Sequence, residues 1–110
     1  MKLDHLPTGM IDWTADEPEI QPGETGIAKI RMRQFGTTRI RVVEFSENYL
    51  GDHWCHDGHI VLVLSGTLIM EHRNDRSYTL TAGMTYHVGT NYVTPHRARC
   101  DEGATVFAID

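Results

Sequence analysis

The chain has 110 residues, of which 40% are hydrophobic and 23% charged. This length and composition are typical of one globular domain with one core, and they exclude a disordered or fibrous chain. With 10 Lys and Arg against 15 Asp and Glu, the formal net charge is -5, and a net-negative surface has no general attraction for nucleic acid or anionic membranes. We therefore expect neither of these as a partner.

No segment has the pattern of a secretory signal or a membrane span. The first ten residues, MKLDHLPTGM, lack an apolar stretch, and the longest apolar run, residues 60–64, is far too short to cross a bilayer. The only two cysteines, Cys55 and Cys100, are too few for a disulfide framework. We therefore expect a cytoplasmic protein, in which a Cys55–Cys100 disulfide is the minor alternative.

The first 24 residues differ in composition from the rest of the chain. They contain three of its four prolines, at positions 7, 18 and 22, together with Gly9 and Gly23. Such a density of residues that interrupt regular structure predicts an irregular N-terminal arm, residues 1–24, lying over a single domain formed by residues 25–110.

From residue 25 onward, short apolar segments alternate with Gly, Asn and Asp turn signals, and no segment keeps helical spacing for three turns. A row of short strands of this kind predicts an all-β sandwich or barrel. The arginines of the first two segments, at positions 31, 33, 39 and 41, are expected on the solvent face of the strands. The predicted strands cover residues 25–34, 37–45, 59–64, 67–72, 77–80, 84–88 and 104–109.

Ser65-Gly66 is a two-residue turn signal between two apolar runs, so it predicts a hairpin that pairs residues 59–64 with 67–72. One face of this hairpin is then formed by His59, Val61, Val63, Leu68, Met70 and His72. The other face carries the apolar residues Ile60, Leu62, Leu64 and Ile69. Both faces must be covered, the outer one by the N-terminal arm or by a second copy of the chain in a homodimer.

The segment GDHWCHDGHIVLVLSG, residues 51–66, holds three histidines and one cysteine within seven residues. Side chains two apart on a strand point the same way, so His53 and Cys55 can face one ion. After the turn at residues 57–58, His59 returns to the same interior. These three residues predict a metal site, whereas His56 has the opposite parity and is expected in solvent.

The spacing His53-x-Cys55, three residues, His59, six residues, Gly66 resembles the first motif of the cupin superfamily. In that motif a second histidine stands at the position of Cys55 and a glutamate at the position of His59. The cluster DHWC at residues 52–55 is similar to that of the small single-domain cupins named for a DHCW motif. The resemblance implies a cupin-type β-barrel, that is a double-stranded β-helix or jelly roll, and a homodimer.

The second motif of the superfamily ends in a histidine ligand, and the resemblance implies that this residue is His96. Gly83 matches the leading glycine of the motif, although the stretch to His96 is two residues longer than the pattern and Cys100 replaces an expected asparagine. His87 is the competing candidate, and the spacing favours His96. The predicted metal ligands are then His53, Cys55, His59 and His96.

Three imidazoles and a thiolate form a soft to borderline ligand set, which predicts Zn²⁺, with Fe²⁺ or Ni²⁺ as alternatives. The cupin resemblance implies functions from dioxygenases to sugar-binding and sensor modules, and the fold does not choose among them. We expect a metal-dependent enzyme or binder for a small polar metabolite in the barrel mouth. The alternative is a non-catalytic binding or sensor module that the metal stabilises. A third hypothesis is metal-free thiol chemistry at Cys55.

No catalytic residue is assigned from the sequence. His72 fits either a hydrogen-bonding partner of a metal ligand or an ordinary core histidine, and Cys100 is expected to be a small buried apolar residue. The remaining side chains that could serve as an acid or base are Glu44, Tyr86, His87 and Tyr92.

Overall fold

The computed structural model describes residues 3, 6–90 and 94–110, whose regular structure is almost entirely β-strand. The all-β prediction is confirmed. Within the described ranges, no helix has the length and apolar character needed to cross a membrane. The elements are η1 (Trp13–Ala15), β1 (Glu19–Pro22), β2 (Ile27–Phe35), β3 (Thr38–Leu50), β4 (His59–His72), β5 (Ser77–Thr81), β6 (Thr85–Val88) and β7 (His96–Ile109).

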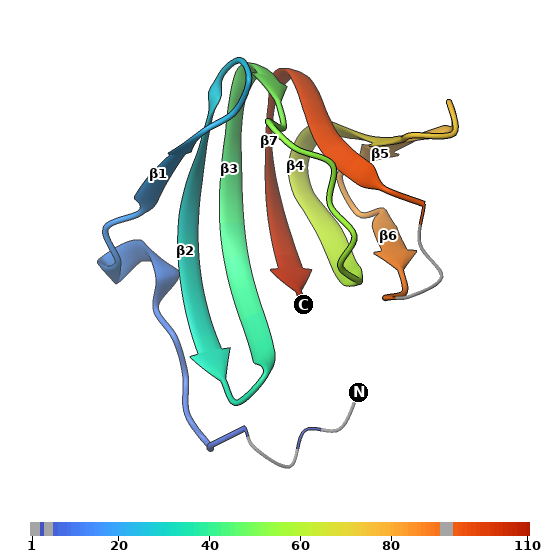
Figure 1. The fold of residues 1–110 in the computed structure, drawn as a ribbon. Helices are drawn as coiled ribbons and strands as arrows, with labels where there is room; N and C mark the ends of the chain where they lie inside the picture. Colours follow the sequence, from blue (N-terminus) through green and yellow to red (C-terminus); the bar gives the residue numbers. More distant parts are fainter. Residues whose placement is uncertain (1–2, 4–5, 91–93) are drawn as a thin grey trace.

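The strands form one antiparallel sheet in the order β1-β2-β3-β7-β4-β5, and β6 pairs with the first part of β4. The last strand, β7, therefore lies between β3 and β4, although both of these strands come much earlier in the sequence. Figure 1 shows that the sheet is strongly curved: β1, β2 and β3 form one wall, β4, β5 and β6 form the other, and β7 arches between them.

The core lies on the concave face of the curved sheet. Across β2, β3, β7 and β4, the register aligns Ile30 with Val43, Val106 and Val63 in one row. Each of the three valines is at most 2% exposed. Burial of one such side chain stabilises the fold by roughly 1.5–3 kcal/mol, so this row fixes which face of each strand turns inward.

Two of the four arginines predicted to face solvent, Arg39 and Arg41, lie on the concave face instead. The β2–β3 register pairs Met32 with Arg41, so odd-numbered residues of β2 and β3 lie on opposite faces of the sheet. Arg31 is therefore on the convex face. Arg39 and Arg41 both form ion pairs with Asp110, which stabilises their inward position.

The hairpin predicted at Ser65-Gly66 is wrong, because β4 continues through these residues. The first part of β4 pairs with β6 and the second with β5, while the register with β7 shifts between residues 63 and 69. Gly66 has a φ of 79°, and a Cβ atom there would overlap the carbonyl oxygen of Gly103. The Ser-Gly pair is thus a bulge that bends one long strand.

The bulge also switches which residues of β4 point inward. Val61 and Val63 are buried before it, and Leu68 and Met70 are buried after it, each at most 5% exposed. The buried positions are odd-numbered before the bulge and even-numbered after it. A two-residue hairpin turn at Ser65-Gly66 would have placed the same residues on the inner face. The predicted inward face is therefore confirmed although the predicted connection is not.

The N-terminal segment, predicted to be irregular, contains the strand β1, which pairs antiparallel with β2 at the sheet edge. Pro22 suits an edge strand, since it cannot donate a backbone hydrogen bond. Ahead of β1, the guanidinium of Arg33 lies over the ring of Trp13 at 5.6 Å and donates to Asp16 Oδ1 at 2.9 Å. The segment is thereby attached to the convex face of β2, and a domain boundary at residue 24 stays a prediction.

Gly66→Ala should destabilise the fold more than Gly83→Ala. Both glycines have left-handed φ values, 79° and 92°, so either substitution strains the backbone by about 1–3 kcal/mol. At Gly66 the new methyl group also meets backbone atoms of Gly103 and Ala104, whereas no described atom lies within 4 Å at Gly83. Urea unfolding should show an additional loss of about 1–3 kcal/mol for Gly66→Ala. Equal losses would show that the bulge accommodates a side chain.

Candidate metal centre

Three side chains from separate parts of the chain converge on the concave side of the sheet. Cys55 lies in the connection between β3 and β4, His59 begins β4, and His96 begins β7. The sulfur of Cys55 and one ring nitrogen from each histidine all lie within 4.8 Å of one another. Two donor atoms bound to one Zn²⁺ at about 2.0–2.3 Å are at most about 4.6 Å apart, so small side-chain movements would bring these three atoms to one ion.

The main chain sets the positions of two of these side chains. The backbone nitrogen of Cys55 donates to the His96 carbonyl at 2.7 Å, and the His96 nitrogen donates to the Cys55 carbonyl at 3.0 Å. This isolated bridge joins the β3–β4 connection to the start of β7. Cys55 and His96 are therefore held side by side before any ion is considered.

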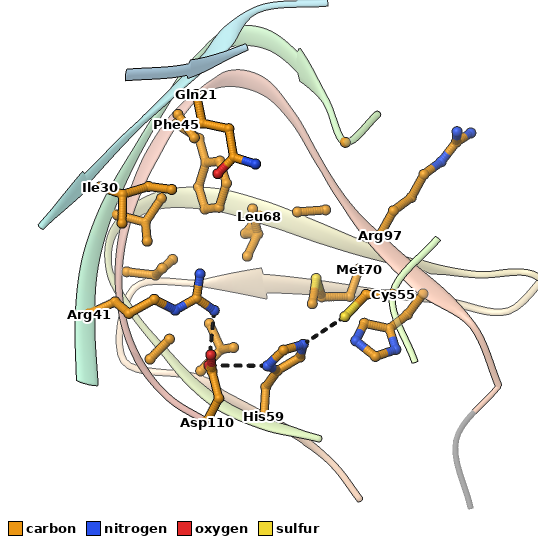
Figure 2. Close-up of a pocket in the computed structure, with 18 of the residues that line it drawn as sticks. Gln21, Ile30, Arg41, Phe45, Cys55, His59, Leu68, Met70, Arg97 and Asp110 are labelled. Atoms are coloured by element: carbon orange, nitrogen blue, oxygen red, sulfur yellow. Dashed lines mark hydrogen bonds and ion pairs between the residues drawn. The ribbon is translucent and has the colours of Figure 1, made fainter. Parts of the chain in front are cut away.

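The ring nitrogens of His59 have separate partners. Nδ1 lies 3.2 Å from Asp110 Oδ1, and Nε2 lies 3.3 Å from Cys55 Sγ. Figure 2 shows this chain of contacts, which Arg41 extends beyond Asp110. A carboxylate behind a histidine whose other nitrogen faces the donor cluster is the arrangement that orients metal-binding imidazoles in proteins.

His96 has one ring nitrogen without a partner. Its Nδ1 lies 3.4 Å from the carbonyl oxygen of Thr94, and because a carbonyl only accepts, Nδ1 carries the proton. Its Nε2 is buried and makes no hydrogen bond with the part of the chain that the structure describes. Burial lowers the pKa of His96, and the neighbouring His59 lowers it further. The ring is therefore neutral at pH 7, which is the form that binds metal.

Asp110 is a buried carboxylate held between cations. Its side chain is 7% exposed and lies 2.9 Å from the Arg39 guanidinium and 3.0 Å from that of Arg41. Burial alone would raise the pKa of Asp110, but the hydrogen bond from His59 and the charges of the two arginines outweigh it and hold the pKa below its usual value. Asp110 thus stays ionised and fixes the orientation of His59.

His72 and Tyr86 pack behind this group. The His72 ring centroid is 5.8 Å from that of His96, and His72 Nε2 lies 2.6 Å from the Tyr86 hydroxyl. Burial lowers the pKa of His72, helped by the charge of Arg76, and burial raises the pKa of Tyr86 to about 12. His72 therefore packs against His96 as a neutral ring, and its Nε2 is hydrogen-bonded to the Tyr86 hydroxyl.

The donor cluster lies on the wall of a cavity of about 380 Å³. Much of the remaining wall is apolar, including Ile30, Phe45 and Leu68. Gln21 and Arg41 enter the cavity from the sheet, as Figure 2 shows. The cavity therefore combines an apolar wall with a few polar groups, of which Arg41 is linked to His59 through Asp110, as is common for small-molecule sites.

Of the four predicted ligands, the structure brings together Cys55, His59 and His96. His53 lines the same cavity, but its side chain is 70% exposed and its Nδ1 lies 2.7 Å from Asp52 Oδ1. Two imidazoles and one thiol, with buried partners behind both rings, fit a borderline divalent ion. Whether all four residues bind metal stays a prediction.

Two further histidines and one of the candidate acids, all in the described residues, lie apart from the cluster. His87 is exposed and pairs with Ile60 on the convex face. His56 is also exposed, as its parity predicted. Glu44 forms an ion pair with Arg31 at 2.7 Å on the convex face. Tyr92 lies outside the described residues.

The two cysteines are both free, so the alternative of a Cys55–Cys100 disulfide is wrong. Cys100 is fully buried, and its sulfur accepts from the Gly103 backbone nitrogen at 3.1 Å and lies 3.4 Å from the Thr67 carbonyl. Burial raises the pKa of Cys100. It is therefore a core residue, in agreement with the expectation from the sequence.

Sequence reasoning missed Asp110. The signal was present, because residues 104, 106 and 108 alternate inward along β7 and the same alternation places position 110 on the concave face. The predicted strand ended at Ile109, which left the carboxylate outside it. Its partner Arg41 was missed for the reason given above, since the β2–β3 register was not predicted.

The fold is shared with solved structures of very different sequence. A cupin-like protein from Thermotoga maritima matches with a TM-score of 0.73 and 19% identity, over 90% of this chain and 80% of that one. A cupin-2 domain-containing protein from Shewanella frigidimarina matches with a TM-score of 0.59 and 21% identity, over 74% and 78% of the two chains. The chain has the cupin fold. KdgF from Halomonas sp. also matches, with a TM-score of 0.70 and 16% identity, over 94% and 93%.

The resemblance predicted from residues 51–66 is thereby confirmed at the level of the fold, and with it the cupin-type barrel. No family model matches the sequence, and no curated protein matches it significantly. At such low identities, structural similarity indicates a shared fold and does not indicate that this chain binds the same ligands as these proteins. The narrower likeness to the DHCW cupins stays a prediction, and the function must be argued from the site itself.

Proposed function

We propose that this chain binds one divalent transition metal ion through Cys55, His59 and His96, and that the ion and the cavity together hold a small polar ligand. The observation that carries the proposal is the buried Nε2 of His96, which has no hydrogen-bond partner in the described residues and lies in a group with a thiol and a second imidazole. An unsatisfied buried polar atom costs about 1–3 kcal/mol, and coordination would remove that cost.

The chemistry of the donors favours Zn²⁺. Thiolate and imidazole are the ligands that Zn²⁺ takes most often, whereas Mn²⁺ and Mg²⁺ prefer oxygen. Fe²⁺ and Ni²⁺ also accept imidazole, so metal analysis must choose among the three. With three protein ligands, a tetrahedral ion keeps one position for an exchangeable group and can polarise a bound oxygen as a Lewis acid.

Arg41 provides a second point of attachment for the ligand. Its Nε is buried without a hydrogen-bond partner in the described residues, although one terminal nitrogen is bound to Asp110 at 3.0 Å. A guanidinium with one unused N–H donor can hold a carboxylate or another oxygen acceptor. We therefore propose a ligand that has an anionic or strongly accepting oxygen at one end.

A structural role for the metal is the second candidate. Cys55 belongs to the irregular connection between β3 and β4, and its described attachment to β7 is the isolated bridge with His96. An ion shared by Cys55, His59 and His96 would fasten this connection to two strands at once. In that case the protein is a non-catalytic module, and the metal only stabilises it.

Protein purified without a nickel column should carry about one equivalent of transition metal per chain. Cys55→Ser and His96→Ala should each lower the metal affinity by tenfold or more, because each removes a donor atom, whereas His56→Ala should leave it unchanged. Elemental analysis and calorimetric titration of the metal-free protein measure both effects. Metal content below about a tenth of an equivalent, with no uptake on titration, would contradict the proposal.

His53→Ala decides between three and four protein ligands in the same experiment. His53 lies at the exposed side of the cavity, so an unchanged affinity is the result expected for the three-residue site. A loss as large as that of Cys55→Ser would instead show that His53 turns inward and closes the site, as the sequence motif predicts.

The Co²⁺-substituted protein should report whether the site holds an exchangeable ligand. We expect visible bands that shift when small carboxylates are added, because the ion keeps an open position beside Arg41. Arg41→Lys retains the charge beside Asp110 but removes the Nε donor, so it should weaken carboxylate binding about tenfold without lowering the Co²⁺ content. Bands that no ligand changes, in a protein whose melting temperature falls steeply on metal removal, would establish the structural role instead.

We also propose that the chain forms a homodimer through the convex face of β3, β7 and β4. The register aligns Ile40, Ile109 and Ile60 in one row across these strands, and Val42, Phe107 and Leu62 in the next. Ile60 is 41% exposed and Leu64 is 50% exposed. Two such apolar faces related by a two-fold axis can pack sheet on sheet.

Light scattering should therefore give twice the monomer mass of 12.5 kDa at micromolar concentration. Ile60→Glu should produce a monomer, because a carboxylate in the apolar row opposes burial of that face. Ile20→Glu is the control, since Ile20 is equally apolar and 50% exposed on the edge strand β1. A monomer mass for the unmodified chain would refute the dimer and show that the convex face of β3, β7 and β4 is exposed to solvent.

A further inference from the structure

A second cavity, of about 330 Å³, is lined by arginines and lies apart from the donor cluster. Its wall includes Arg73, Arg76, Arg97, Arg99 and Trp54. Two acidic residues, Glu71 and Asp75, also line it, so two positive charges remain in excess. Glu24 and Asp101, which lie outside this lining, also approach Arg97 and Arg99, so the positive excess is located at Arg73 and Arg76.

Trp54 forms one side of this cavity. The guanidinium of Arg97 lies over its ring at 4.4 Å, and that of Arg73 lies over it at 5.7 Å. These contacts restrict both guanidinium groups without using all their N–H donors. Trp54 thereby holds two cations close together that would otherwise repel each other.

Among the described residues, the acidic side chains around the cavity pair with Arg97 and Arg99 but not with Arg73 or Arg76. Glu71 is shared between Arg97 and Arg99, each with an Nε–carboxylate distance of 3.0 Å. Arg97 also lies 3.8 Å from Glu24, and Arg99 lies 4.0 Å from Asp101. In the described residues, neither Arg73 nor Arg76 has an acidic side chain within 4.0 Å. The two exposed guanidinium groups of Arg73 and Arg76 thus keep their N–H donors available for an anion.

The cavity lies behind the donor cluster, on the other side of the bridge between Cys55 and His96. Neighbouring residues on extended chain point in opposite directions. Cys55 and His96 line the first cavity, Trp54 lines the second, and Arg97 lines both. Figure 2 shows Arg97 at the side of the first cavity, beyond Cys55. The two cavities therefore adjoin along one pair of backbone segments, with Arg97 between them.

We propose that this second cavity binds a small oxyanion, either a phosphate group or a carboxylate group of a small molecule. Guanidinium groups bind both kinds of oxyanion through paired, charge-assisted hydrogen bonds. Arg73 and Arg76 line one space of about 330 Å³, which is large enough for such a group. The proposal does not depend on metal binding at Cys55, His59 and His96.

A test can use the fluorescence of Trp54. The chain has two tryptophans, so Trp13→Phe leaves Trp54 as its only indole. Titration with sodium phosphate, against sodium chloride at equal ionic strength, should give a saturable change with a dissociation constant of about 1 mM or lower. Calorimetry on the unmodified chain repeats the measurement without a substitution.

Arg76→Gln should weaken phosphate binding about tenfold or more, because it removes one charge-assisted interaction. Arg73→Gln should have a similar effect. Lys29→Gln is the matched control, since it removes the same charge from an exposed position on β2, and it should change the affinity by less than about twofold. Equal effects of all three substitutions would show that phosphate is attracted only by the overall charge of the protein, and would overturn the proposal.

Two further comparisons identify the anion and its place. Saturation by methyl phosphate but not by acetate assigns the site to phosphorylated molecules, and the reverse assigns it to carboxylates. The titrations are repeated on metal-loaded protein and after dialysis against a chelator. A response that needs the metal and that Arg76→Gln leaves unchanged would place the anion at the donor cluster and contradict the proposal. The absence of a saturable response to either anion would also refute it.

Discussion

The bends in β4 and β7 are the constraint on which the rest of the structure depends. A straight strand of the length of β7 would span roughly 45 Å, yet residues at its two ends, His96 and Asp110, both belong to one small site. The strand returns on itself as Figure 1 shows, and Gly103 in β7, with a φ of 105°, lies against Gly66 in β4. Without side chains at these two positions, the paired strands can bend together and close the cavity.

The bridge between Cys55 and His96 then couples the irregular connection to the bent sheet. Its two hydrogen bonds position residues of both cavities, because Cys55 and His96 line the first, Trp54 lines the second, and Arg97 lines both. A shift of this bridge would move residues of both cavities together. The positions of the donor cluster and of the arginine cavity therefore depend on the same two backbone hydrogen bonds, although their chemistry differs.

The sequence predicted most of the fold because strand signals are local. Alternating apolar residues identified six of the seven strands, and β1 was missed because its four residues are all exposed. Ser65-Gly66 was read as a turn because a left-handed glycine serves turns and bulges alike. At the site, the clustered motif identified Cys55 and His59, and His96 followed from the cupin resemblance. The alternation along β7 placed Asp110 on the inner face, but its pairing with His59, 51 residues away, was not predictable, since only the register of β4 with β7 brings the two together.

The unsatisfied polar atoms indicate where the molecule departs from a plain structural barrel. Buried polar atoms in native proteins nearly always have partners, so each exception needs a reason. In the described residues, the buried side-chain atoms with neither a hydrogen bond nor a close ion-pair partner are Arg41 Nε and His96 Nε2. Both residues line the first cavity, whereas the apolar core contains no such atom among the described side chains. These two atoms are therefore the part of the structure that stability alone does not explain, and the proposed ligand site rests on them.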